Sequence, residues 1–253
     1  MKLTIVGSAA AYTLRPGHAS ACYLVEADGE AILLDLGQGA FSALGAYREP
    51  STLGAVFISH LHPDHGIDVI PLRHYLRYAC SPPREVALHA PSEFRARIDA
   101  LQGEPGFLSG LPGADIAPGT ARVGGFAVEA RPVTHSLNSF GFRLTREGDG
   151  RGRSVGLVYS GDCGRPEDVA ALIRPGDTLL CEASWGATVE PPDGAMHLNA
   201  EQAATIARDG GAARLLLTHV LDEHDPASAL DIARRVFAGP TDLAEAGMSV
   251  ETD

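Results

Sequence analysis

Histidine and aspartate side chains are concentrated in one short segment of the chain, His60–His65, with the sequence HLHPDH. His60 and His62 are two residues apart, so on extended backbone they point to the same side and can bind one metal ion. Asp64 and His65 follow the turn at the proline and can bind a second ion. Two divalent ions held close together activate a water molecule and neutralise the charge of an in-line displacement. The segment therefore predicts the metal site of a hydrolase.

The remaining candidate ligands share one feature, which is that each follows an apolar run of strand length. The runs and their candidates are Ala55–Ile58 before His60–His65, Phe126–Arg131 before His135, Ser154–Tyr159 before Asp162, and Arg214–Thr218 before His219. Functional side chains often sit in loops that a rigid scaffold positions. Ligands spread over much of the chain, each at a strand exit, can converge on one edge of a sheet.

The elements that must position these residues follow from hydrophobic periodicity. Strands are predicted at Leu3–Val6, Cys22–Glu26, Ala31–Asp35, Ala55–Ile58, Val86–His89, Phe126–Arg131, Phe140–Leu144, Ser154–Tyr159, Thr178–Cys181 and Arg214–Thr218. Helices are predicted at Ile67–Tyr78, Ser92–Leu101, Glu167–Ile173, Ala200–Asp209 and Ala227–Phe237. Gly103–Gly119 is expected to be an irregular loop and Gly148–Gly152 a hairpin tip. The pattern predicts an α+β fold, a four-layer αββα sandwich, formed by residues 1–253 as a single domain.

Composition limits the possible partners. The net charge of −12 and the pI near 5.2 disfavour a stable nucleic-acid partner, because a polyanion would be repelled by most of the surface. The four cysteines include no CxxC pair and the chain begins without a signal-peptide pattern, so we expect reduced thiols and a cytoplasmic protein. No apolar run approaches the roughly 20 residues of a membrane span, so no membrane partner is expected.

The motifs together resemble the metallo-β-lactamase superfamily. The matching segments are Ser59–His65, Thr134–His135, Ser160–Asp162 and Leu217–His219. The resemblance implies the αββα sandwich with two divalent metal ions, usually Zn²⁺, with Mn²⁺ or Fe²⁺ as alternatives that the same ligands accept. By matching position, one ion takes His60, His62 and His135, the other takes Asp64, His65 and His219, and Asp162 bridges them.

Within this superfamily the chain resembles the ribonuclease Z and phosphodiesterase branch. Asp162 rather than cysteine occupies the bridging position, and Leu180–Trp185 is similar to the branch's His-Glu-Ala-Thr segment, with Cys181 in place of the histidine. The resemblance gives Glu182 and His197 the role of its glutamate–histidine pair. Ribonuclease Z carries a long tRNA-binding arm between the equivalents of His135 and Asp162, and the short connection here leaves no room for one.

The resemblance implies a phosphodiesterase acting on small phosphodiesters such as cyclic nucleotides, through a metal-activated hydroxide. His197, oriented by Glu182, would protonate the leaving alkoxide, and Asp64 could also accept the proton of the water. The alternatives are a ribonuclease Z-like tRNA 3′ endonuclease, a lactonase or thioesterase, and a non-catalytic ligand carrier. The intact ligand set disfavours the carrier.

Several points stay open from sequence alone. A homodimer is possible, because dimers are common in the branch. Arg73 and Arg77 lie four residues apart and could bind a phosphate, although a surface pair balanced by acids such as Asp68 is favoured. His18 and Trp185 could lie in the pocket or outside it.

Overall fold

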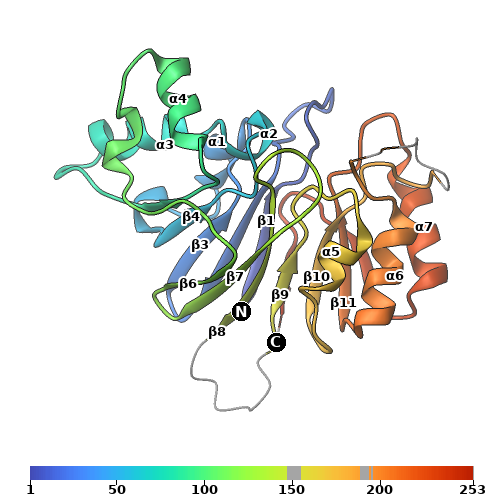
Figure 1. The fold of residues 1–253 in the computed structure, drawn as a ribbon. Coiled ribbons are helices and arrows are strands. Elements are labelled where there is room, and N and C mark those ends of the chain that lie inside the picture. The colour runs from blue at the N-terminus through green and yellow to red at the C-terminus, as the bar shows by residue number, and fades with distance from the viewer. Residues whose placement is uncertain (147–154, 189–193, 195, 253) are drawn as a thin grey trace.

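The computed structural model describes residues 1–146, 155–188, 194 and 196–252, and in these ranges the chain forms two sheets that pack face to face with helices on both outer faces (Figure 1). The first sheet has the order β13-β1-β2-β3-β4-β5 and the second β12-β11-β10-β9-β8-β7-β6. The predicted four-layer αββα sandwich is confirmed. The predicted hairpin tip Gly148–Gly152 lies outside the described residues.

The first sheet consists of β1 (Lys2–Gly7), β2 (Cys22–Ala27), β3 (Glu30–Leu34), β4 (Ala55–Phe57), β5 (Ala87–His89) and β13 (Ser249–Glu251). The second consists of β6 (Gly119–Val123), β7 (Phe126–Pro132), β8 (Phe140–Arg146), β9 (Leu157–Tyr159), β10 (Thr178–Glu182), β11 (Arg214–Thr218) and β12 (Thr241–Leu243). Strands β9, β10, β11 and β12 run parallel, as do β3, β4 and β5.

Helices cover the outer face of each sheet. Those beside the first sheet are α1 (Ala40–Leu44), α2 (Pro63–Gly66), α3 (Val69–His74) and α4 (Phe94–Gln102). Those beside the second sheet are α5 (Pro166–Ala170), α6 (Ala200–Gly210) and α7 (Pro226–Val236). None of the described helices combines the length and apolarity that crossing a bilayer requires.

Alternation along the strands builds three hydrophobic layers. In β2, Leu24 packs under the helices of the first sheet, whereas Tyr23 and Val25 face the second sheet. In β11, Leu216 lies between the sheets and its neighbour Leu217 packs under α6 and α7. Both faces of these strands are buried, which is why they are continuous apolar runs in the sequence.

The helix starts follow from capping side chains. Asn199 accepts a hydrogen bond from the amide of Gln202, and the Gln202 side chain accepts one from the amide of Asn199, so the two residues form a capping box at the start of α6. The predicted helix Ile67–Tyr78 corresponds to two elements in the structure. Helix α3 is followed at Tyr75–Ala79 by a π-helix, labelled η2. The predicted loop Gly103–Gly119 contains a 3₁₀ turn, η3 (Phe107–Gly110), and its last residue begins β6.

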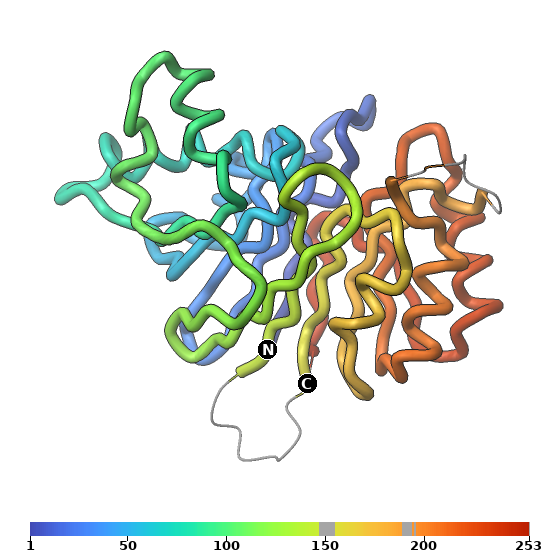
Figure 2. Tube along the Cα trace, in the orientation of Figure 1, coloured from blue at the N-terminus to red at the C-terminus, as the bar shows by residue number. Residues whose placement is uncertain are grey.

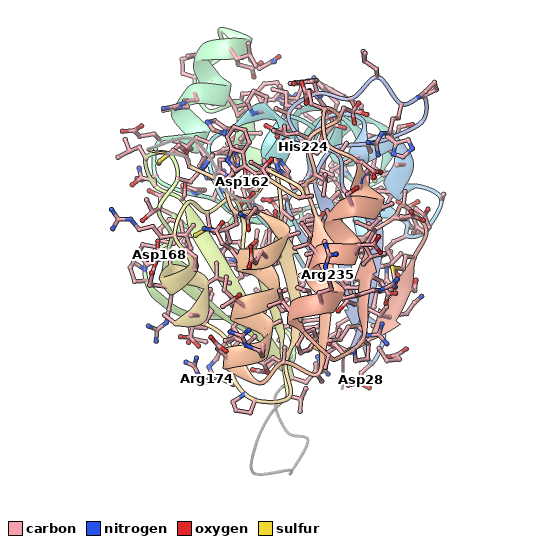
Figure 3. All side chains as sticks on the ribbon, turned by 90° about the vertical axis from the view of Figure 1, so that its right-hand side faces the viewer. Asp28, Asp162, Asp168, Arg174, His224 and Arg235 are labelled. Atoms are coloured by element: carbon pink, nitrogen blue, oxygen red, sulfur yellow. The ribbon has the colours of Figure 1, made fainter. Side chains whose placement is uncertain are left out.

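The strand exits that matter for function lie at one end of the sandwich. In the view of Figure 3, Asp162 and His224 lie near the upper end of the molecule, while Asp28 and Arg174 lie near the lower end. The first and last strands meet at that lower end, where the amide of Thr252 donates to the carbonyl of Met1 at 2.9 Å (Figure 2). The first and last strands therefore pair at the lower end, and the candidate site lies at the opposite, upper end.

Candidate metal centre

All seven predicted ligands come together at the upper end, where loops from both sheets meet. The loop after β4 supplies His60 and His62, and α2 supplies Asp64 and His65. The second sheet supplies the other three from the exits of β7, β9 and β11, namely His135, Asp162 and His219. The convergence predicted from the strand exits therefore appears in the structure.

The first group of ligands, which we call cluster one, consists of His60, His62 and His135. His62 Nδ1 lies 3.0 Å from His60 Nε2 and 3.2 Å from His135 Nε2. Asp162 Oδ2 lies 3.7 Å from the Nε2 atoms of both His60 and His135. Two ligands bound to one zinc ion at 2.0–2.1 Å with a tetrahedral angle are about 3.3 Å apart, which matches these spacings.

The second group, cluster two, consists of Asp64, His65 and His219. His219 Nε2 lies 3.2 Å from both His65 Nε2 and Asp64 Oδ2. The other carboxylate oxygen of Asp162, Oδ1, lies 3.4 Å from His65 Nε2 and 3.7 Å from His219 Nε2. Asp162 thus presents one oxygen to each cluster, as a bridging ligand would.

Hydrogen bonds on the far side of each ring fix the tautomers. The Nδ1 of His65 donates to Asp35 Oδ2 at 2.7 Å, and the Nδ1 of His135 donates to the Met196 carbonyl at 2.8 Å. Ser184 Oγ already donates to Glu182, so it accepts from the Nδ1 of His219 at 3.0 Å. The Nε2 atoms of these three rings therefore carry lone pairs rather than protons.

These lone pairs test whether the residues fit metal ions. His65 Nε2 and His219 Nε2 face each other at 3.2 Å, so in the neutral tautomers two lone pairs meet, and a cation between them would relieve the repulsion. Asp162 Oδ1 is buried and accepts no hydrogen bond from a described residue, a costly arrangement for a carboxylate. The pKa of Asp162 lies well below its usual range, because burial, which raises it, is outweighed by the neighbouring His219, His65 and His60. The residues fit two divalent cations.

Asp35 supports the centre from behind His65, and sequence reasoning did not assign it a role. Its carboxylate accepts from His65 Nδ1, from the Ser59 amide at 2.6 Å and from the Tyr159 hydroxyl at 2.7 Å. Asp35 is fully buried. A buried aspartate at the end of an apolar strand was visible in the sequence, but its partners lie 24, 30 and 124 residues away.

We expect the substitution Asp35→Asn to weaken metal binding about 10- to 100-fold, the usual effect of losing an outer carboxylate that orients a ligating histidine. Competition with a chromophoric chelator measures this affinity. The matched control is Asp209→Asn, which alters an exposed pair with Arg208. Equal metal affinity in Asp35→Asn and wild-type protein would contradict the role given to Asp35.

His197 lies beside the two clusters, bonded to Glu182 as the glutamate–histidine pairing predicts. Its Nδ1 lies 3.0 Å from Glu182 Oε1 and 3.8 Å from Asp162 Oδ2. Glu182 is buried and is also held by the Cys163 amide at 2.6 Å. Burial lowers the pKa of His197, but the hydrogen bond and the charge of Glu182 outweigh it and raise the pKa to about 9. The raised pKa favours the protonated imidazole, although His197 also forms a group with Asp162 and His219 that could hold a metal.

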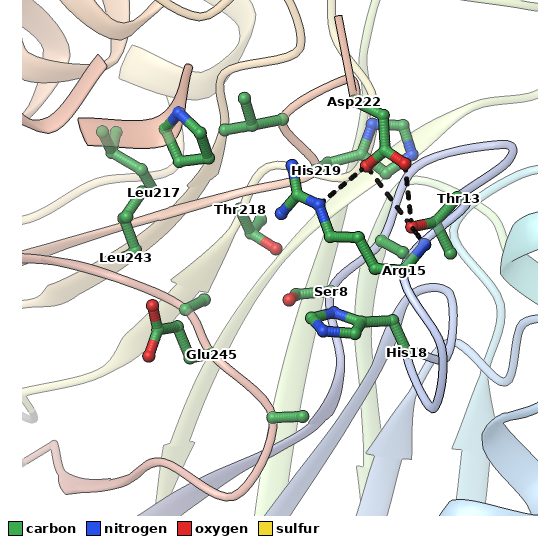
Figure 4. Close-up of a pocket in the computed structure, with 15 residues that line it drawn as sticks. Ser8, Thr13, Arg15, His18, Leu217, Thr218, His219, Asp222, Leu243 and Glu245 are labelled. Carbon is green, nitrogen blue, oxygen red and sulfur yellow. Dashed lines mark hydrogen bonds and ion pairs between the residues drawn. The ribbon is translucent and has the colours of Figure 1, made fainter. Parts of the chain in front are cut away.

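A cavity of about 410 Å³ lies next to the centre, between the N-terminal loop and the ends of β11 and β12 (Figure 4). His219 and His18 both line it, and Arg15 and Asp222 pair at 3.2 Å across its rim. The structure thus places His18 close to the site. Trp185 does not line this cavity; its ring lies 6.0 Å from that of His224.

The two cysteines near the centre are structural. Cys181 is fully buried, and burial raises the pKa of its thiol. The Cys163 thiol donates to the Arg165 carbonyl at 3.1 Å. Among the described residues, neither cysteine belongs to a group of side chains that could hold a metal.

Comparisons with known proteins agree with this architecture. A family model described as the β-lactamase superfamily domain matches residues 32–220. An uncharacterised protein of Mycobacterium tuberculosis is 33% identical, over 95% of this chain and 88% of its own length. Ribonuclease Z of Myxococcus xanthus is 28% identical, over 99% of this chain and 97% of its own length. The crystal structure of the metallo-β-lactamase-fold protein YhfI from Bacillus subtilis superposes with a TM-score of 0.84 at 24% identity, covering 98% of both chains.

Proposed function

The chain belongs to the β-lactamase superfamily and is a metallo-hydrolase of the metallo-β-lactamase fold, and we propose that it is a phosphodiesterase for small phosphodiesters such as cyclic nucleotides. The observation that carries the proposal is the Glu182–His197 pair beside Asp162. When a phosphodiester is hydrolysed, its leaving group departs as an alkoxide, which needs a proton. A protonated histidine beside the metal clusters supplies that proton.

The residues divide the work as follows. Cluster one, cluster two and the bridging Asp162 would hold two divalent ions, most simply Zn²⁺, which supply a nucleophile at neutral pH and draw charge from the phosphoryl oxygens. Glu182 keeps His197 protonated and directs its ring. Asp64 would bind a metal ion and could also accept the proton of the water. Burial raises its pKa, and the hydrogen bonds to His219 and His65 more than offset this and lower it.

The size of the substrate is inferred from the cavity beside His219. Its volume of about 410 Å³ falls in the range of small-molecule sites. The alignment with ribonuclease Z of Myxococcus xanthus spans 307 positions, whereas this chain has 253 residues. The relative therefore carries additional segments, and here β8 and β9 leave only residues 147–156 between them. The alternative function, tRNA 3′ processing, is disfavoured because this short connection leaves little room for an arm that would hold tRNA.

We expect kcat/KM for a 3′,5′- or 2′,3′-cyclic nucleotide to exceed that for precursor tRNA by at least about tenfold, because the net charge of −12 opposes binding of a polyanion. Side-by-side kinetics on a cyclic nucleotide, a precursor tRNA and a lactone decide this. A higher kcat/KM for the tRNA would favour the ribonuclease. Hydrolysis of the lactone alone would show that the centre acts on carbonyl carbon and would remove the role of His197.

A further inference from the structure

Three arginines surround a second cavity, of about 300 Å³, which shares no lining residue with the metal centre. Arg73 comes from α3, Arg77 from η2, and Arg84 from the segment that leads to β5. Ser109 and Gly110 of η3 also line the cavity. In Figure 1, α3 lies over the outer face of the first sheet, on the other side of the molecule from α7.

The Arg73 side chain is fixed by its contacts, but its two Nη atoms make only weak hydrogen bonds. Its side chain is only 6% exposed, its Nε donates to the Phe107 carbonyl at 3.0 Å, and its guanidinium lies 4.2 Å from the centre of the Phe107 ring. The two Nη atoms have only long contacts of 3.4 Å, to His74 Nδ1 and to the exposed carboxylate of Glu104. Strong charge-assisted hydrogen bonds are about 2.7–2.9 Å long. The Nη atoms of Arg73 can therefore still donate stronger hydrogen bonds to another acceptor.

The acid expected to balance these arginines is engaged elsewhere. Asp68 accepts the amide of Phe41 at 2.9 Å and faces the start of α1. Arg77 and Arg84 form no ion pair with any residue in the described part of the chain, and Arg77 has only a ring contact of 5.3 Å with Tyr78. The one acid in the cavity wall is Glu85. Asp68 therefore does not balance Arg73 and Arg77; the acid that pairs with Arg73 is Glu104, at 3.4 Å, and Arg73 itself is buried rather than on the surface.

The charge of this cavity contrasts with that of the whole molecule. Three arginines and one acid, Glu85, line the cavity, and Glu104 pairs with Arg73, so the lining carries a net positive charge in a chain whose net charge is −12. Guanidinium forks match the paired oxygens of a phosphate. The enclosed volume is at the lower end of the range for small-molecule sites. The acidic remainder of the surface disfavours a nucleic acid here.

The geometry points to a second ligand site, in which Arg73, Arg77 and Arg84 bind the phosphate group of a small molecule away from the metal centre. Arg73 is the fixed donor at the bottom of the site. Arg77 and Arg84 are exposed and complete the site from the rim. This inference does not depend on which substrate the metal centre hydrolyses.

Amide chemical shifts of the metal-loaded protein, titrated with inorganic phosphate, test the site directly. We expect the amides of Ser109 and Gly110 to shift in a saturable way. The double variant R77A/R84A should weaken this response at least about tenfold, as expected from losing two charge-assisted contacts. Phosphate that binds at the metal centre is separated by position, because it would shift the amides of His62 and His135 in both proteins.

The matched control is the double variant R97A/R208A, which removes two arginines that pair with acids on exposed helix surfaces. It should leave the Ser109 response unchanged. Phosphate shifts confined to the metal centre would overturn the proposal, as would equal weakening in both double variants. Shifts at Ser109 caused by an RNA oligonucleotide and not by phosphate would also overturn it, in favour of an RNA-binding surface.

Discussion

Replacing Asp162 by alanine should release metal from both clusters and lower turnover by more than about 100-fold, the upper end of what losing an outer hydrogen bond costs a metal site. Asp162 presents Oδ2 to His60 and His135 and Oδ1 to His65 and His219. Without it, each cluster keeps three ligands but loses the anion that holds the two ions together. Elemental analysis of protein purified without chelator should give about two ions per wild-type chain and markedly fewer per variant chain.

The control for this experiment is Asp209→Ala, on the exposed end of α6, which should keep both ions. Thermal unfolding of the metal-stripped wild-type protein shows how much of the change is a loss of fold rather than of ligand. Wild-type protein that contains no transition metal and keeps its activity after exhaustive chelation would refute the two-metal centre.

Replacing His197 by alanine should leave both ions bound and lower kcat on cyclic nucleotides by about 10²- to 10⁴-fold, the usual contribution of a general acid. Activated aryl phosphodiesters have leaving groups that need little protonation, so their hydrolysis should fall much less. His74→Ala, an exposed histidine on α3, is the control. Loss of metal in His197→Ala, or equal losses on both substrates, would show that His197 is not the acid.

The same assignment sets a pH dependence. Because His197 acts in its protonated form, hydrolysis of a cyclic nucleotide should fall as the pH rises through the pKa of His197. That pKa is about 9 with Glu182 as its partner, and bound cations would move it lower by repelling the imidazolium. The wild-type pH profile should therefore have a descending limb at or below about pH 9, and His197→Ala should lack it.

The ligands were predictable because a local sequence pattern marks each of them. His60–His65 identifies itself by spacing, and each of His135, Asp162 and His219 follows a recognisable apolar run. Asp35 was not predictable in the same way, because its role depends on contacts with Ser59, His65 and Tyr159 that only the folded chain creates.

Most strands and helices were predictable from periodicity, including the three-residue strands β4, β5 and β9, whereas β6, β12 and β13 were not. Strands β12 and β13 have three residues each and owe their existence to pairing with β11 and β1. The partners of β13 lie almost a whole chain length away, since Lys2 pairs with Glu251. The edge strand β6 has an exposed sequence with little apolar alternation. Helix α4 begins at Phe94 rather than at Ser92, because Glu93 adopts a left-handed conformation with φ 73°.

The origin of the ligands ties chemistry to durability. Each cluster takes side chains from the loops of both sheets. Bound ions would therefore cross-link the two halves of the sandwich at its upper end. An ion that binds only the folded chain adds about 2.7 kcal/mol to the free energy of unfolding when its free concentration is 100 times its Kd. Loss of metal would therefore lower the resistance of the folded protein to proteases as well as its activity. Metal supply would then affect both the amount of the enzyme and its activity.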